Sequence, residues 1–166
     1  MPTPFYTPDD YNKYNVLNVP PSLLWANLYL LKHYLIFAVP FFAKIPLISK
    51  IAKPLSNVIP SEEYSGVLLL YSCIPALLVL VSMARRLPHS QDYMRWIWKR
   101  GRQLLLTSII LEMVIIAIYL LLEIQKFSSV TLAFLYIDVV LIVFLFKSRR
   151  VNDALAEFPA FKEKEK

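Results

Sequence analysis

Four long apolar blocks constrain the fold of this chain more than any other feature. They run over residues 23–43, 64–84, 104–124 and 127–146. Each has about 20 residues, which is the length an α-helix needs to cross a hydrocarbon core about 30 Å thick. Because backbone polar groups in lipid must be satisfied within the segment, each block is predicted to be a transmembrane helix. Barrel strands would instead alternate apolar and polar residues.

The composition favours the same fold class. Of the 166 residues, 57% are hydrophobic and 18% are charged, whereas soluble domains have about 45–50% and about 25% respectively. The sequence therefore predicts an all-α integral membrane protein in three parts. A cytoplasmic N-terminal arm spans residues 1–22, a four-helix transmembrane domain spans 23–146, and a charged cytoplasmic tail spans 147–166. The tail is expected to be solvated and partly disordered.

Lysine and arginine residues are distributed unevenly between the predicted loops, and this asymmetry sets the expected orientation. The side that holds both termini and the second loop has 13 of them, and the other side has four. The thirteen are Lys13, Arg85, Arg86, Arg95, Lys99, Arg100, Arg102, Lys147, Arg149, Arg150, Lys162, Lys164 and Lys166; the four are Lys44, Lys50, Lys53 and Lys126. Both termini are therefore predicted to be cytoplasmic.

Two loops are predicted to lie in the membrane interface. Residues 44–63 interleave apolar residues with lysines, which is typical of a short amphipathic interfacial segment. Residues 90–102 are expected to form an interfacial helix that leads into the third span, with its tryptophans at the headgroup level. The second loop is a candidate surface for anionic lipids or a partner, or else a simple aromatic anchor. Its candidate residues are Arg85, Arg86, Arg95, Trp96, Trp98, Lys99, Arg100 and Arg102.

Ionisable residues also occur inside the apolar blocks. Lys32, Glu112 and Asp138 lie nine or ten residues from the cytoplasmic ends of their blocks, and at about 1.5 Å per residue they reach the bilayer midplane. Because an unpaired charge there costs at least about 2.5–3.5 kcal/mol, the polar faces are expected to meet. The predicted buried polar network consists of Lys32, His33, Tyr71, Glu112, Glu123 and Asp138. It is either an ion-pair cluster that fixes helix register or a proton or cation relay.

The beginning of the chain carries a recognisable pattern. Asp9-Asp10-Tyr11-Asn12-Lys13-Tyr14 is followed by Leu17, by Pro20-Pro21-Ser22-Leu23-Leu24-Trp25 and by Leu31-Lys32-His33-Tyr34-Leu35-Ile36-Phe37. Over these residues the chain resembles the YfeZ-like family of small bacterial inner-membrane proteins, whose function is unknown. Asn15 stands where the family's pattern has a glycine. The resemblance implies a multi-pass protein of the bacterial inner membrane and no particular activity.

No motif points to catalysis or to a cofactor, because HExxH, GxGxxG, P-loop and GxSxG patterns do not occur. The two histidines, His33 and His89, are too few and too separated for a metal site. An enzyme is therefore not favoured.

The leading expectation is a non-catalytic accessory subunit or assembly factor that contacts lipids and a larger membrane partner or further copies of itself. Two alternatives are a small proton- or cation-coupled transporter that uses the midplane carboxylates, and a membrane-embedded enzyme or lipid-binding protein. The basic residues beside the helix ends do not favour nucleic acid.

Overall fold

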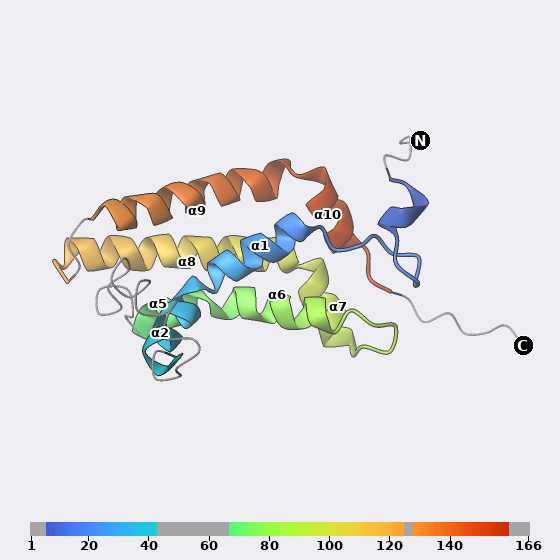
Figure 1. Cartoon of the computed structure of the whole chain (residues 1–166), viewed down its shortest axis with the longest axis horizontal. Coiled ribbons are helices and arrows are strands. Elements are labelled where there is room, and N and C mark those ends of the chain that lie inside the picture. The colour runs from blue at the N-terminus through green and yellow to red at the C-terminus, as the bar shows by residue number, and fades with distance from the viewer. Residues whose placement is uncertain (1–5, 43–66, 125–127, 160–166) are drawn as a thin grey trace, which may run out of the picture.

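The structure is a computed structural model that describes residues 6–42, 67–124 and 128–159. Within these ranges every regular element is a helix, apart from a single bridge between Tyr11 and Leu17. The all-α prediction is therefore confirmed for the described chain. Helices α8 (Gly101–Leu121) and α9 (Ser129–Lys147) are long and apolar enough to cross a membrane. They run side by side along the length of the molecule (Figure 1).

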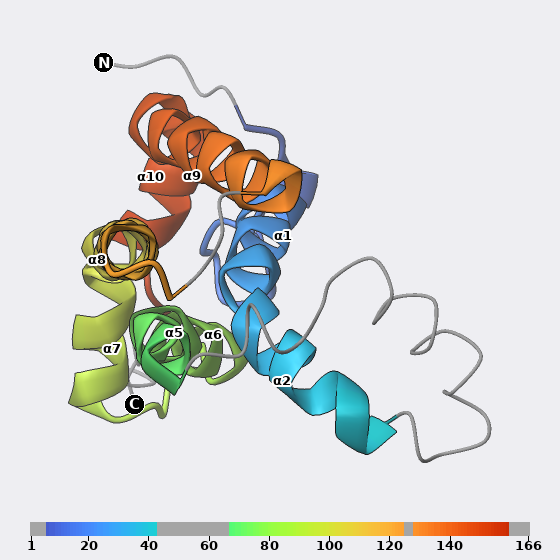
Figure 2. The same cartoon turned by 90° about the vertical axis from the view of Figure 1, so that its left-hand side faces the viewer.

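The first two apolar blocks are each divided into shorter helices. The first forms α1 (Pro21–Leu30) and α2 (Lys32–Phe42), separated by Leu31, and the described part of the second forms α5 (Val67–Ser72) and α6 (Ile74–Ala84), separated by Cys73. The second interruption has a clear cause, since Pro75 in the first turn of α6 has no N–H to donate to the preceding turn. Figure 2 shows α2 leading away from the other helices.

Helix α8 lies at the centre of the packing and contacts α1, α5, α6 and α9. The largest buried cluster joins residues from all parts of the chain, namely Leu23, Leu30, Leu31, Cys73, Ala76, Val79, Trp98, Leu105, Ile109, Leu145, Val151 and Leu155. Helix α9 is attached by a narrow stripe, because its buried residues are Thr131, Asp138 and Leu145, at intervals of seven. Two helical turns separate successive members of this stripe.

One end of the molecule gathers three segments that are far apart in the sequence. They are the N-terminal arm with the short helix η1 (Pro8–Asp10), helix α7 (Asp92–Lys99) and helix α10 (Arg149–Ala156) (Figure 1). Helix α7 falls within the predicted interfacial helix and is separated from α8 by Arg100 alone. The predicted amphipathic segment at 44–63 lies outside the described residues.

Helix α10 corrects the expectation of a solvated tail. Val151, Ala154 and Leu155 are buried against α7 and α8. The Ser148 hydroxyl accepts a hydrogen bond from the Val151 N–H and begins the helix. The apolar residues at this helical spacing stabilise the helix by packing, although the overall composition of the tail is charged.

Candidate functional site

Four ionisable side chains meet inside the apolar part of the molecule, and we call them the charge cluster: Lys32, His33, Glu112 and Asp138. Lys32 Nζ lies 2.5 Å from Glu112 Oε1 and 3.9 Å from Asp138 Oδ1. His33 Nε2 lies 3.0 Å from the same Glu112 oxygen. None of the four residues is more than 8% exposed. The cluster thus connects α2, α8 and α9 through charge.

An aromatic pair encloses the ammonium group of the cluster. Lys32 Nζ lies 4.0 Å from the centre of the Tyr29 ring and 5.2 Å from that of Phe134. The two rings meet edge to face at 6.5 Å, and the Tyr29 hydroxyl donates to the Phe134 carbonyl oxygen at 3.2 Å. Ring faces attract a desolvated cation. No sequence pattern marked Phe134, since a phenylalanine in an apolar block is indistinguishable from its neighbours.

The two carboxyl groups of the cluster have unequal surroundings. Glu112 faces both Lys32 and His33, whereas Asp138 faces Lys32 at the longer distance and the Tyr29 hydroxyl. The Tyr29 hydroxyl is neutral, so the ammonium of Lys32 compensates a charge on Glu112 more strongly than a charge on Asp138.

Two predicted members of the network lie elsewhere. Tyr71 is 59% exposed on α5. In one continuous helix it would share a face with residues of α6, but the interruption at Cys73 changes the helical phase between the two. Glu123 follows the end of α8 at a φ of 57°. There its N–H bonds to the Leu120 carbonyl, and the next N–H bonds to that of Tyr119. This is a Schellman turn, which directs the chain out of the helix.

At the opposite end, the arm, α7 and α10 are bound to one another, and we call residues 6–18, 92–99 and 149–159 the collar. The Tyr6 hydroxyl donates to Asp153 Oδ2 at 2.6 Å, and Arg150 Nη2 lies 2.6 Å from Asp10 Oδ1. The Leu17 N–H donates to Glu157 Oε2 at 2.7 Å. The collar therefore holds the two described ends of the chain together.

Arg86 and Trp98 are buried under the tail, which corrects the prediction that they face lipid or a partner. Arg86 donates to the carbonyl oxygens of Leu17 at 2.7 Å and Glu157 at 2.8 Å. Trp98 Nε1 donates to the carbonyl oxygens of Glu157 at 2.9 Å and Ala154 at 3.0 Å. Burial lowers the pKa of the Arg86 guanidinium, and the charge of Glu157 opposes that shift. Both side chains are structural because they satisfy carbonyl groups of the tail.

The other candidate basic residues differ in how far they are engaged. Arg95 donates to the Pro88 carbonyl oxygen at 2.8 Å, and Arg102 donates to Asn152 Oδ1 at 3.2 Å. Arg100 lies 4.5 Å from the centre of the exposed Trp96 ring. Arg85, Lys99 and Arg100 are exposed. These three cations are available to a ligand or partner.

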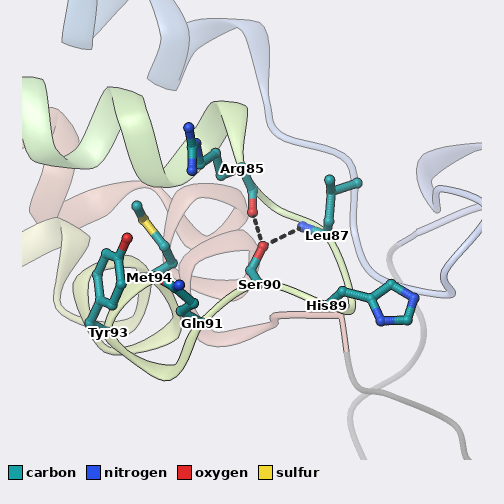
Figure 3. A pocket seen from close by; sticks show the side chains of 7 residues that line it. All are labelled: Arg85, Leu87, His89, Ser90, Gln91, Tyr93 and Met94. Atoms are coloured by element: carbon teal, nitrogen blue, oxygen red, sulfur yellow. Dashed lines mark hydrogen bonds between the residues drawn. The ribbon is translucent and has the colours of Figure 1, made fainter.

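Two hollows open beside these cations. One has a volume of 320 Å³ and lies at the turn between α6 and α7, where the Ser90 hydroxyl bonds to the Arg85 carbonyl oxygen and the Leu87 N–H (Figure 3). The other has a volume of 380 Å³ and lies between the arm, α7 and the tail. The first is lined by Arg85, Leu87, His89, Ser90, Gln91, Tyr93 and Met94, and the second by Asn15, Val16, Arg95, Lys99, Ala156, Glu157, Phe158 and Pro159. Both are bordered by positive charge.

Over the described residues, the fold and the site define a class: a helical protein with two helices able to cross a membrane and a charge cluster buried between helices. The chain belongs to the family described as protein of unknown function (DUF2919), which matches residues 6–157. No curated protein and no solved structure matches it. Among the described residues, no group of three His, Cys, Asp or Glu side chains is placed to hold a metal ion.

Proposed function

We propose that the protein is a non-catalytic accessory subunit or assembly factor of a larger complex in the bacterial inner membrane. The observation that carries the proposal is the collar, in which three separate segments are bound into one surface. Arg85, Lys99 and Arg100 are exposed on or beside it. An ordered cationic surface is suited to recruiting a partner with an acidic face.

Four spans with both termini in the cytoplasm are the membrane arrangement that we propose with this role. Helices α8 and α9 supply two spans by length and composition. The pairs α1–α2 and α5–α6 supply the other two, each pair being interrupted at one residue. Outward-facing residues of α9 such as Leu132 and Val143, 56% and 55% exposed, suit a surface in contact with lipid.

The sidedness is supported by two independent features. The arm, the region after α6 and the tail contact one another, and segments in contact outside the bilayer must share one side of it. The excess of lysine and arginine in those segments favours the cytoplasmic side. The resemblance of residues 9–37 to the YfeZ-like family supports a bacterial inner membrane.

The partner that fits the collar is a larger integral membrane protein with an acidic cytoplasmic segment. The test is purification of the tagged protein from native membranes in mild detergent. A stoichiometric larger protein is expected with the wild type, and it should be lost when Arg85, Lys99 and Arg100 are all changed to Glu. Lys147→Glu is the matched control, since Lys147 is exposed at the end of α9 and lies outside the collar.

The purification also separates the alternatives. Recovery of the wild type without another protein would overturn the accessory role. A homo-oligomer that conducts protons in liposomes would instead favour the small proton- or cation-coupled transporter, for which the charge cluster is the supporting observation. Each variant must elute from size exclusion as the wild type does, so that loss of the partner reports on the surface and not on folding.

A further inference from the structure

The charge cluster has more acids than permanent cations. Glu112 and Asp138 supply two carboxyl groups, Lys32 supplies one ammonium, and His33 is cationic only when it is protonated. All four are buried. Because an uncompensated charge in a low-dielectric interior is costly, the cluster is most stable when its net charge is zero. Neutrality requires one more proton, which either His33 or Asp138 must carry if Glu112 is ionised.

The distances decide which carboxyl group stays ionised. Glu112 Oε1 lies 2.5 Å from Lys32 Nζ and 3.0 Å from His33 Nε2, so both nitrogens stabilise its charge. Asp138 Oδ1 lies 3.9 Å from Lys32 Nζ, and the other polar side chain beside Asp138 is the neutral Tyr29 hydroxyl. An ionised carboxylate is stabilised by close opposite charge, and Asp138 has less of it than Glu112.

We propose that the charge cluster is a binding site for one exchangeable proton, carried by Asp138 with His33 as the alternative carrier. With the proton on Asp138, Lys32 pairs with Glu112 alone and His33 donates through Nε2 to Glu112. When the proton leaves Asp138 and binds His33 Nδ1, Lys32 lies between two carboxylates and His33 is cationic. The net charge is zero in both states, so the proton can change carrier without charging the interior.

Other titratable groups near the cluster do not alter this balance. The Tyr29 hydroxyl of α1 lies near Asp138 and Glu112, and the Cys73 thiol between α5 and α6 lies near Glu112 and Lys32. A phenol and a thiol are much weaker acids than a carboxyl group, so both stay neutral when the carboxyl groups compete for the proton. The proton site would exist with or without a larger partner, since every group in it belongs to this chain.

Isotope-edited infrared spectroscopy of the purified wild type in lipid nanodiscs tests the site. A protonated carboxyl band is expected at neutral pH, moving in D₂O and moving again when aspartate is labelled with ¹³C at its side-chain carboxyl. Of the five aspartates, Asp138 alone is buried, so the label identifies it. The absence of a protonated carboxyl band at neutral pH would overturn the proposal, as would a band insensitive to the aspartate label.

Variants then assign the roles. Asp138→Asn should remove the band. Glu112→Gln should also remove it, because Lys32 would then have Asp138 as its sole carboxylate partner and a neutral cluster would need no extra proton. His33→Gln should keep the band at least as strong as in the wild type, and Asp153→Asn, at an exposed position, should leave it unchanged. A band that persists in Glu112→Gln, or disappears in His33→Gln, contradicts the charge balance. The wild-type spectrum decides even if a variant fails to fold.

Discussion

Among single residues, Lys32 is expected to affect stability most, because its ammonium lies between carboxyl groups from two helices. Removing one partner of a buried ion pair typically costs about 3–5 kcal/mol, since the other charge remains buried. We expect Lys32→Met to lower the free energy of unfolding in detergent by an amount of this order. Lys99→Met, at an exposed position, should change it by less than about 0.5 kcal/mol. Equal stability of the two variants would mean that the pair contributes little.

Asn15 explains how the arm turns without a glycine. Its φ of 56° lies in the left-handed region, which Gly adopts freely and Asn adopts more readily than other residues. The Asn15 N–H bonds to the Asn12 carbonyl, and Asn12 Oδ1 accepts from the Tyr14 N–H at 2.9 Å. The residue therefore suits a turn that requires a positive φ.

This conformation gives a prediction for the arm. Asn15→Val should destabilise the turn by about 1–2 kcal/mol, because a β-branched side chain clashes in the left-handed region. Asn15→Gly should leave it close to the wild type. Hydrogen exchange of the amides in residues 11–17 measures both variants. Unchanged protection in Asn15→Val would show that the arm turns by another route.

At the scale of elements, Arg86 joins three of them, since it donates to carbonyl oxygens of the arm and of the tail from the end of α6. Arg86→Ala should leave the Leu17 carbonyl oxygen without this donor, and the carbonyl oxygens of the tail with Trp98 alone. Both segments should loosen, which faster hydrogen exchange in residues 6–18 and 149–159 would report. The neighbouring Arg85→Ala is the matched control, because Arg85 is exposed. Equal exchange in the two variants would contradict the structural role of Arg86.

The contact between the arm and α10 depends on pH in both directions. Hydrogen bonds from the Thr7 backbone N–H and hydroxyl, aided by Arg150, hold the pKa of Asp10 below its usual value of 3.8. A lowered pKa in the folded state gives stabilisation that is present above the usual value and lost as the pH falls through the folded one. The hydrogen bond to Asp153 raises the pKa of Tyr6 from 10.0 to about 12. That stabilisation is present below pH 10 and lost as the pH rises through about 12.

We therefore expect the arm to detach at acidic and at strongly alkaline pH. A spin label at Lys13→Cys, in a Cys73→Ala background, should become more mobile below the usual pKa of Asp10. Asp10→Asn should abolish the acid transition, and Tyr6→Phe should abolish the alkaline one. Transitions that persist unchanged in these variants would assign the pH dependence to other groups.

The helices differ in how much the sequence could predict about them. Hydropathy located α8 and α9 within a few residues, and Pro75 accounts for the interruption before α6. Counting residues from the block ends predicted that Lys32, Glu112 and Asp138 share one depth, and the structure brings these side chains together. Nothing local marked the interruption at Leu31. Helix α10 had a readable signal, the Ser148 cap followed by apolar residues at helical spacing, which the charged composition of the tail outweighed.

For the whole molecule, the collar predicts that three segments are equally hidden from the outside of the cell. Single cysteines at Lys13, Gln91 and Lys162, placed in a Cys73→Ala background, should be protected from an impermeant thiol reagent added outside. A cysteine at Lys53, on the loop predicted to face outward, is the control and should react. Labelling of Gln91→Cys from outside would overturn the proposed topology.

The long-range hydrogen bonds of the collar can form only late in synthesis of the chain. The Leu17 N–H bonds to a side chain 140 residues further along the chain, so the arm is synthesised long before its partner leaves the ribosome. Until translation passes Glu157, the indole of Trp98 and the guanidinium of Arg86 lack acceptors that the tail later supplies. In a chain stalled before α10, the arm would therefore not be bound and Trp98 would be exposed. A membrane protease that recognises unfolded segments would cleave such a stalled chain and spare the completed one.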